Sequence, residues 1–367
     1  MNKILSKTTL LLLSAALFFN SCKKEVSDAI TPEQNEEAVL KAEADNAVTA
    51  EQQTAANFER DFNGMMGNDV AARHQKNIVQ IAQSLPLFKS LVAAVVKTGL
   101  AGTLSSASLN ATVFAPTDAA FAKLPVPFNN AANIASITDA GQIEALKNIL
   151  LYHVLGTEVK RNQITQGRSN TTALNGGTLY FSNSFSVLLV NGNSLVLIAN
   201  VDASNGVIHV IDDVLLPPSQ NIAQIALGNP AFSTLVAALA KTNLVSVFTG
   251  TGDFTVFAPT NTAFAKLPAP FNSAANISAI TNQAQIDALA NILKYHVTGT
   301  RYFAWDFGIF NSIPTLAAAP GNQLRGILGF NSGFIKGNSN STFSKANPVN
   351  ILATNGVVHV MDQVLLP

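Results

Sequence analysis

Two stretches of this 367-residue chain repeat each other motif by motif, and no other feature constrains the fold as strongly. The sequence Thr-Val-Phe-Ala-Pro-Thr begins at Thr112 and again at Thr255, and Tyr-His-Val begins at Tyr152 and again at Tyr295. The other repeated motifs are Asn-Ile-X-Gln-Ile-Ala at Asn77 and Asn221, Asn-Gly-Val-X-His-Val at Asn205 and Asn355, and Val-Leu-Leu-Pro ending at Pro217 and Pro367. Each copy is about 140 residues long, the size of a whole domain rather than of one solenoid turn. The sequence therefore predicts two domains, 75–217 and 219–367.

The order of the motifs within each copy predicts helices first and strands afterwards. In the first copy, Ile78, Ile81 and Leu85 recur at helical spacing, and Thr112–Phe114 is a short segment of β-prone residues. After Tyr152 the pattern changes to strands separated by tight turns, because Asn and Gly accept positive φ angles. These turns are Asn175-Gly176-Gly177, Asn191-Gly192 and Asn205-Gly206. We therefore expect an α+β fold with antiparallel strands in each domain.

The motifs, in this order, resemble the fasciclin (FAS1) domain, and they do so twice. The resemblance rests on Thr-Val-Phe-Ala-Pro-Thr, Tyr-His, Asn-Gly-Val-Ile-His-Val-Ile-Asp and Val-Leu-Leu-Pro, and it covers 75–217 and 219–367. It implies that each domain is a wedge-shaped β-sandwich with helices packed at one edge. It also implies a protein of the kind found among extracellular and membrane-anchored adhesion or matrix proteins.

The first 22 residues have the composition of a bacterial lipoprotein signal peptide. Lys3 and Lys7 form a basic start, residues 8–19 are apolar, and Ser21 precedes Cys22, the only cysteine of the chain. Acylation of Cys22 gives a membrane anchor, since each buried methylene contributes about 0.8 kcal/mol. We therefore expect a cell-envelope protein anchored in the outer membrane, either exposed at the surface or facing the periplasm. An ordinary secretory leader is the alternative.

Residues 23–74 form an acidic spacer between this leader and the first domain. The segment is rich in Ala, Gln and Asn, and its first aromatic residue is Phe58. Thr31 and Pro32 resemble the cap and first turn of a helix, so we expect a mobile, partly helical spacer. Over the whole chain 22 basic residues balance 22 acidic ones, which disfavours nucleic acid as a partner.

Four histidines and two tyrosines occupy matched positions in the two copies. They are Tyr152, His153 and His209 in the first copy, and Tyr295, His296 and His359 in the second. Each Tyr-His pair ends an apolar helix face, and the later histidine alternates with apolar residues of a strand. A buried imidazole must be hydrogen-bonded, so all six residues are interpreted as structural. A ligand role, or a hydrolase centred on the paired histidines, is the alternative. No carboxylate or thiol cluster accompanies them, so the sequence predicts no catalytic, metal or cofactor site.

In animal proteins of the resembled family, the Tyr-His segment and an Asp-Ile pair before the last Asn-Gly turn are associated with integrin binding. The matching pairs here are Asn200-Val201 and Asn350-Ile351. Asn in place of Asp removes the carboxylate that could engage a metal-dependent receptor. We therefore do not expect integrin-type recognition.

The segment that follows the Tyr-His motif differs between the copies and is seven residues longer in the second. It contains Tyr302, Phe303 and Trp305, the only tryptophan of the chain. Aromatic rings beside a variable loop suit a sugar or a protein partner, so these three residues are candidate binding residues. The alternative is that they repack an altered core.

Together these features predict a non-catalytic adhesion or interaction protein of the bacterial cell surface. Its two domains would bind extracellular protein or glycan partners weakly, with linkage raising the avidity, and would touch the membrane through the lipid anchor only. The short junction Pro217-Pro218-Ser219 favours a fixed orientation of the domains. The alternative function is a carbohydrate-binding accessory lipoprotein of an envelope nutrient-uptake system, using the aromatic residues of the second copy.

Overall fold

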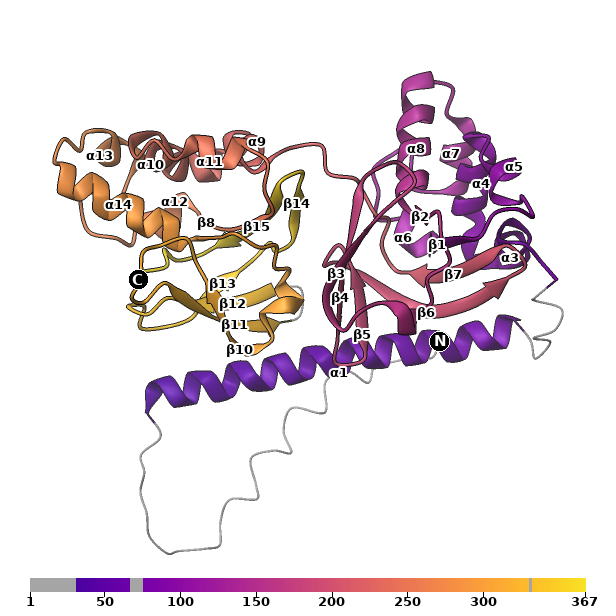
Figure 1. Cartoon of the computed structure of the whole chain (residues 1–367), viewed down its shortest axis with the longest axis horizontal. Coiled ribbons are helices and arrows are strands. Elements are labelled where there is room, and N and C mark those ends of the chain that lie inside the picture. Colours follow the sequence, from indigo (N-terminus) through magenta and orange to yellow (C-terminus); the bar gives the residue numbers. More distant parts are fainter. Residues whose placement is uncertain (1–30, 67–74, 330–331) are drawn as a thin grey trace, which may run out of the picture.

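The computed structural model describes residues 31–66, 75–329 and 332–367. Two domains lie side by side, and a long helix, α1 (Pro32–Met66), runs beneath both in the view of Figure 1. The first domain contains the elements from α3 to β7, and the second those from α9 to β15. The expected signal peptide and the expected lipid attachment at Cys22 lie outside the described residues.

Helices open each domain at matched positions. Asn77 and Asn221 each start one through a capping box, in which the Asn side chain and a Gln three residues later exchange bonds with backbone N–H groups. Pro86 and Pro230 then start a short 3₁₀ turn, because proline is tolerated at the first position of a helix but not inside it. The helices of the first domain are α3 (Ile78–Ser84), η1 (Pro86–Phe88), α4 (Lys89–Lys97), α5 (Ala101–Leu104), α6 (Asp118–Phe121), α7 (Ala131–Ser136), α8 (Ala140–Tyr152) and η2 (Arg161–Gln163). Those of the second are α9 (Ile222–Leu227), η3 (Pro230–Phe232), α10 (Ser233–Lys241), α11 (Val245–Thr249), α12 (Asn261–Phe264), α13 (Ala274–Ser278), α14 (Gln283–Tyr295) and η4 (Ala304–Phe307).

The strands of each domain form one hydrogen-bonded path. In the first domain the order is β2-β1-β7-β6-β5-β4-β3, and in the second it is β10-β11-β12-β13-β15-β8-β9, with β14 also pairing β15. The first-domain strands are β1 (Ala111–Pro116), β2 (Val154–Leu155), β3 (Gly167–Thr172), β4 (Thr178–Ser184), β5 (Val187–Val190), β6 (Ser194–Ala203) and β7 (Gly206–Ile211). The second-domain strands are β8 (Phe254–Pro259), β9 (Val297–Thr298), β10 (Ile309–Pro314), β11 (Gln323–Gly329), β12 (Ser332–Lys336), β13 (Ser344–Ala346), β14 (Ile351–Ala353) and β15 (Gly356–Met361). The later strands pair antiparallel, as expected, whereas β1 with β7 and β8 with β15 are parallel.

The sheet of each domain folds back on itself to make a sandwich. The ring centroids of Phe114 in β1 and Phe181 in β4 lie 5.7 Å apart, although β7, β6 and β5 separate these strands along the sheet. Strand β6 joins the two layers, and its pairing with β7 contains two register shifts, which bend a strand. In the second domain Phe257 of β8 shares a buried core with Leu324 of β11 and Ile335 of β12, and Phe307 of η4 fills the space beside it, at 5.8 Å between ring centroids. The expected sandwich with helices at one edge is confirmed.

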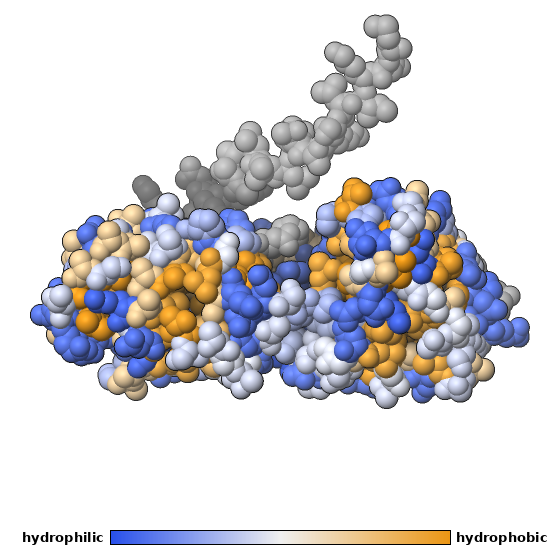
Figure 2. All heavy atoms as spheres, turned by 90° about the horizontal axis from the view of Figure 1, so that it is seen from above, coloured by the Kyte–Doolittle hydropathy of each residue, from blue (hydrophilic) through white to orange (hydrophobic). Residues whose placement is uncertain are grey.

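The outer face of β1 supports the helices. Along this strand Phe114 faces the sandwich, whereas Val113 and Ala115 face the core formed with α3, α4 and α8. Each domain therefore has two apolar cores, one on either side of its parallel strand pair. Figure 2 shows the molecule from above, where apolar residues lie among hydrophilic ones on both domains. Val96 of α4 and Leu227 of α9 are exposed apolar side chains of these helices.

The Asn-Gly motif joins the helices to the sheet in both copies. Gly206 has a φ of 141°, and a Cβ at this position would collide with the carbonyl oxygen of Ala111 on the neighbouring strand. The side-chain oxygen of Asn205 accepts from the backbone N–H of Ile78 at 2.9 Å, and its amide group donates to two carbonyl groups at and just after the end of α5. Gly356 occupies the equivalent corner of the second domain.

Helix α1 packs along both domains, which differs from the mobile spacer expected for this segment. Leu40, Ala44, Ala47 and Phe62 are buried along it, and it lies against β11 of the second domain and against β5 and β6 of the first. Most helical stability in proteins comes from such packing of one face. The stripe is narrow and made partly of alanine, so the low overall apolarity of the spacer concealed it.

Polar contacts join the first turns and the middle of α1 to the two domains. Acidic side chains of its first turns bind the second domain, and a glutamine near its middle binds the first. The contacts are Glu33 with Lys336, Glu37 with Arg325, Glu36 with the backbone N–H of Phe343, and Gln52 with the carbonyl oxygen of Phe185. Acidic residues of this segment thus have binding partners on the second domain.

Within the described ranges, no single helix is both long enough and apolar enough to cross a membrane. One pair of short helices, Ile78–Ser84 and Pro86–Lys97, reaches the required length and hydropathy only together, with a bend of 106° between them.

Candidate functional site

The aromatic residues of the second copy lie between the two domains. Trp305 and Phe303 are 6% and 2% exposed, and Tyr302 is half-buried. The edge of one ring meets the face of the other where Trp305 packs on Phe185, at 6.4 Å between centroids, and Phe303 lies 6.0 Å from Tyr180 of β4. The expectation that these rings offer a stacking face to a ligand in solvent does not hold in this arrangement, because the first domain covers them.

Two arginines cross the interface in opposite directions, each stacked on a tyrosine of the other domain. The guanidinium carbon of Arg168 lies 3.8 Å from the ring centroid of Tyr302, and that of Arg301 lies 4.2 Å from the centroid of Tyr180. Arg168 also donates from Nη1 to the carbonyl oxygen of Arg301 at 2.8 Å. Cation–π contacts strengthen when they are removed from water, as Arg301 is here.

Asn350 joins the domains through its amide group. Its Nδ2 donates to the carbonyl oxygen of Gly192 and to Oδ1 of Asn193, both at 2.9 Å. These residues belong to the turn between β5 and β6, where Asn191 and Gly192 both have positive φ. A Cβ on Gly192 would collide with the ring of Phe303, so the turn needs glycine for its contact with the second domain as well as for its shape.

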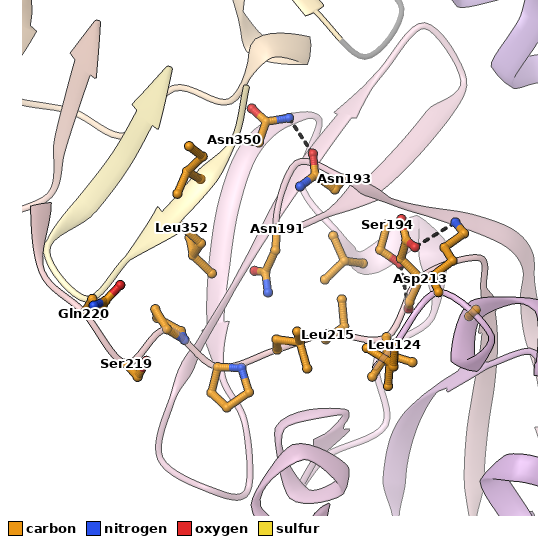
Figure 3. Close-up of a pocket in the computed structure, with 18 of the residues that line it drawn as sticks. Leu124, Asn191, Asn193, Ser194, Asp213, Leu215, Ser219, Gln220, Asn350 and Leu352 are labelled. Carbon is orange, nitrogen blue, oxygen red and sulfur yellow. Dashed lines mark hydrogen bonds and ion pairs between the residues drawn. The ribbon is translucent and has the colours of Figure 1, made fainter. Parts of the chain in front are cut away.

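Below this contact the domains enclose an open cleft of about 550 Å³, which we call the junction cleft. Figure 3 shows the dashed contact between Asn350 and Asn193 on one side of it, and the linker with Leu215 and Ser219 on another. Apolar side chains from the linker and from both domains line much of its wall. They are Leu124, Val190, Val214, Leu215, Leu216, Pro217, Pro218, Ile225, Ile351 and Leu352.

A charged pair marks one rim of the junction cleft. Lys123 donates to Oδ1 of Asp213 at 2.7 Å and to the carbonyl oxygen of Asp212. Burial, together with the neighbouring Asp213 carboxylate, raises the pKa of Asp212 to about 6. The Asp212 carboxylate accepts from the backbone N–H of Leu195, which ties β6 to the end of β7.

The two Tyr-His histidines bind backbone groups through both ring nitrogens. Nδ1 of His153 lies 2.8 Å from the carbonyl oxygen of Ile149, and Nε2 accepts from the N–H of Leu215 at 2.9 Å. His296 makes the equivalent contacts in the second domain. This geometry requires a neutral ring with its proton on Nδ1, and burial lowers the pKa of both residues to about 4. Neither ring nitrogen is free to act as a general base or metal ligand.

The two strand histidines are committed in the same manner. Nε2 of His209 lies 2.9 Å from the carbonyl oxygen of Val159, and its Nδ1 accepts from the N–H of Asn200 at 3.2 Å. His359 does the same with Tyr302 and Asn350. Burial lowers the pKa of both rings, to about 4 for His359. These contacts support the structural interpretation of the four histidines, which stays a prediction.

The two motif tyrosines point their hydroxyl groups at the sheet. Tyr152 donates to the carbonyl oxygen of Thr178 at 2.7 Å and accepts from Asn191, while Tyr295 donates to that of Gln323 at 2.6 Å. Burial raises the pKa of Tyr152 to about 12 and also raises that of Tyr295. Among the residues that the structure describes, no group of three or more His, Cys, Asp or Glu side chains is placed to hold a metal ion.

Sequence reasoning singled out Tyr302, Phe303 and Trp305 as candidate binding residues for an external partner, and it identified none of the first-domain residues that contact them here. Arg168, Tyr180 and the turn Asn191-Gly192-Asn193 were not singled out as contact residues. A signal was present, because aligning the two copies sets Trp305 and Phe303 against polar residues of the first copy. An aromatic residue whose matching position in the other copy is polar indicates a surface that packs against another domain or partner.

Comparison with known proteins agrees with the duplicated architecture. The model of the fasciclin domain matches residues 86–217 and 230–367. Transforming growth factor-beta-induced protein ig-h3 of Sus scrofa is 30% identical over 256 residues, which are 70% of this chain but only 34% of that protein. Cell surface glycolipoprotein MPB83 of Mycobacterium bovis is 34% identical over 157 residues, 41% of this chain and 65% of that protein.

A solved FAS1 domain pair from the insect cell adhesion molecule fasciclin I is also similar, with 21% identity and a TM-score of 0.36 over 75% of this chain and 95% of that one. The two family matches cover most of the chain, one in each domain of the structure. The chain therefore belongs to the fasciclin domain family.

Proposed function

We propose that this protein is a non-catalytic adhesion or interaction protein displayed on the bacterial cell envelope, and that it binds an extracellular partner in the junction cleft. The observation that carries the proposal is that both domains line one cleft while side-chain contacts fix their relative position. Clefts at domain interfaces are common binding sites. Similarity to a cell surface glycolipoprotein supports the envelope location.

The committed histidines support a function without catalysis. Histidine is the side chain best suited to acid–base chemistry near neutral pH. His153 and His296 spend both nitrogens on backbone groups, and so do His209 and His359. A hydrolase centred on them would first have to break bonds that hold each domain together.

The lining of the junction cleft favours a protein partner. Leu216 is half exposed within it, next to the rigid pair Pro217-Pro218, and Ile351 and Leu352 complete the apolar wall from the second domain. Apolar pockets with a polar rim suit an apolar side chain of a partner, which then becomes the anchor of the interface.

Substitution of one exposed leucine inside the junction cleft and of another outside it tests the role of the cleft. We expect Leu216→Gln to weaken binding of partner cells or matrix proteins about tenfold, because it places a polar group at the apolar wall. Leu227→Gln is the matched control, since Leu227 is exposed on α9 and does not line the cleft. Binding is measured with the full chain on arrays of extracellular proteins and on whole cells. Equal binding by both variants and the unchanged protein would overturn the role of the cleft.

Envelope display is tested separately at Cys22. We expect incorporation of a labelled fatty acid into the chain and its loss in Cys22→Ser, with the variant released from membranes. Added protease should cleave the protein on intact cells if the anchored chain faces outwards. A chain that remains in the membrane fraction without label would contradict acylation.

The course of α1 gives this display an orientation. The helix begins against the second domain and, at 35 residues, is about 50 Å long before it reaches its end at the first. Only nine residues separate Cys22 from Pro32. Anchoring at Cys22 therefore places the second domain nearer the membrane than the first, although it comes later in the sequence. Dyes on engineered cysteines of each domain, with acceptor lipids, should show stronger energy transfer from the second domain.

A further inference from the structure

A second cavity lies at the domain interface, apart from the junction cleft. Its volume is about 370 Å³, and each domain supplies five of its lining residues. Those from the first domain are Arg168, Ser169, Asn170, Tyr180 and Phe181, and those from the second are Asp253, Thr300, Arg301, Phe303 and Asp306. We call it the arginine pocket. Its size is within the range of small-ligand sites, which also favour domain interfaces.

The two arginines of this pocket are held in place before any ligand arrives. Arg301 donates from Nε to Oδ1 of Asp253 at 2.5 Å and from Nη1 to carbonyl oxygens of the β14–β15 corner, and it is 5% exposed. Arg168 is fixed by its stacking on Tyr302 and by its bond to the carbonyl oxygen of Arg301. Side chains that are already ordered lose little entropy when they bind.

Hydrogen-bonding capacity remains in the wall of the pocket. A guanidinium group carries five N–H donors, and the described residues accept from Arg168 at one of them. The exposed amide of Asn170 makes no bond to the described residues and offers both a donor and an acceptor. Asp306 accepts from the N–H of Phe303 through Oδ2 and has the Ser182 hydroxyl beside its carboxylate. A carboxylate has about four acceptor positions, so Asp306 can accept further hydrogen bonds.

The charges of the pocket disfavour a strongly charged ligand. Arg168 and Arg301 are balanced by Asp253 and Asp306, so the lining has no net charge. A phosphate or carboxylate ligand would meet two carboxylates, and a cation would meet two guanidinium groups. A hydroxyl group donates and accepts at once, so a ligand rich in hydroxyl groups can use both kinds of partner.

We propose that the arginine pocket is a binding site for a neutral saccharide, held between the two domains by Arg168, Asn170 and Asp306. Recognition is by hydrogen bonds to ring hydroxyl groups, because the faces of Tyr180 and Phe303 are already occupied. The site exists only when the two domains are docked, because the first domain supplies Arg168 and Asn170 and the second supplies Asp306. It is separate from the junction cleft and goes beyond the function proposed above.

Calorimetry with the full chain and neutral disaccharides (maltose, cellobiose, mannobiose) tests this site, with digalacturonate as the charged comparison. We expect binding of at least one neutral disaccharide, and a loss of about tenfold in affinity for Asn170→Ala and for Arg168→Gln, since bonds to charged or oriented groups are removed. Arg325→Gln is the control, because Arg325 also bridges to another element, α1, but lies outside the pocket.

The only tryptophan reports whether docking survives in each variant. Trp305 is buried at the interface, so its emission moves to longer wavelength when the domains separate. Arg168→Gln removes a docking bond, whereas Asn170→Ala removes none, so the second variant decides if the first shifts the emission. The proposal is overturned if no neutral disaccharide binds, if Asn170→Ala binds as tightly as the unchanged chain, or if digalacturonate binds best. Partner binding through Leu216 is measured independently and is untouched by these outcomes.

Discussion

Just after their Tyr-His motifs, the two copies share one backbone framework, but one exposes polar side chains there and the other buries aromatic ones against the other domain. The register is fixed by Thr112 and Thr255, whose hydroxyl groups donate to the carbonyl oxygens of Thr157 and Thr300 at 2.8 and 2.7 Å. The next six residues are Glu158-Val159-Lys160-Arg161-Asn162-Gln163 in the first copy and Arg301-Tyr302-Phe303-Ala304-Trp305-Asp306 in the second.

Among the residues that the structure describes, the second of these segments packs against the other domain, whereas the first makes its contacts within its own domain. In the first copy Lys160 forms ion pairs with Glu158 and Asp202 at 3.7 and 3.2 Å, and Asn162 is exposed. In the second copy Phe303 and Trp305 are covered by the other domain. The fasciclin fold therefore tolerates either surface at this place, and the docking partner, rather than the fold, determines which side chains are suitable there.

Acidification gives the largest expected effect, and it should affect both copies alike. Burial holds the pKa of His153 and His296 at about 4, against 6.5 for a free histidine. Below pH 6.5 the unfolded chain therefore takes up protons that the folded chain refuses. The free energy of unfolding is therefore unaffected by these histidines above pH 6.5. As the pH falls from 6.5 to 4, it decreases by about 1.4 kcal/mol per pH unit for each such histidine.

One aspartate in each copy opposes this loss in part. Burial raises the pKa of Asp212 and of Asp306 to about 6, from 3.8, so the folded chain binds these protons first and gains stability as the pH falls from 6 towards 3.8. Each copy has two buried histidines against one such aspartate, so the net change is a loss. Thermal unfolding followed by circular dichroism between about pH 7 and pH 4.5 checks it. A transition that moves for one domain and stays fixed for the other would break the equivalence of the two cores.

Trp305→Ala should destabilise the chain by about 3 kcal/mol, because truncation of a large buried aromatic leaves a cavity at the interface. Asn162→Ala is the matched control at the same framework position, and we expect a change within about 0.5 kcal/mol there. Urea unfolding followed by circular dichroism gives both values. Similar losses in the two variants would mean that the aromatic residues are not used for docking.

Asn350→Asp should weaken docking by about 2 kcal/mol. The substitution removes the Nδ2 donor that binds Gly192 and Asn193, and it places a carboxylate against two oxygen acceptors. Asn200→Asp is the control, because Asn200 has the same positive φ and the same backbone contacts through its oxygen, but no contact with the other domain through its amide. A red shift of Trp305 emission in Asn350→Asp alone is the expected result, whereas a shift in both variants would assign the effect to the turn itself.

The contrast between Asn200 and Asn350 also shows how far the sequence could be followed. Repetition of whole motifs predicted two α+β domains and placed the histidines on apolar faces, since periodicity depends on each element alone. From the exchange of Asp for Asn at these two positions, sequence reasoning inferred only the loss of a carboxylate. The structure adds a donor at Asn350 that an Asp would lack, which depends on where the other domain lies.

Contacts between domains leave little periodic signal, and this explains what was missed. Arg168 lies on β3, which consists of glycine and polar residues, and Tyr180 lies on β4 between two apolar residues, so neither pattern marks them as receiving Tyr302 and Arg301. Helix α1 is similar: its buried stripe consists of only Leu40, Ala44, Ala47 and Phe62, set among many polar residues. Both features follow from the arrangement of distant segments, which local patterns do not encode.

The smallest expected effect concerns α1, which treats the two copies differently because its acidic end binds only the second. We expect Glu37→Gln to weaken this contact by about 0.5 kcal/mol, since an ion pair of partly exposed side chains contributes little. Asp45→Asn is the control, because Asp45 pairs with Lys41 within the helix and with neither domain. Hydrogen exchange of the backbone amides in the first turns of α1 should rise about twofold in Glu37→Gln and should match this value in the unchanged chain at high salt, where the ion pair is screened. Exchange that rises equally along the whole helix would instead show that α1 leaves both domains as one unit, and that its apolar stripe, common to both, controls its release.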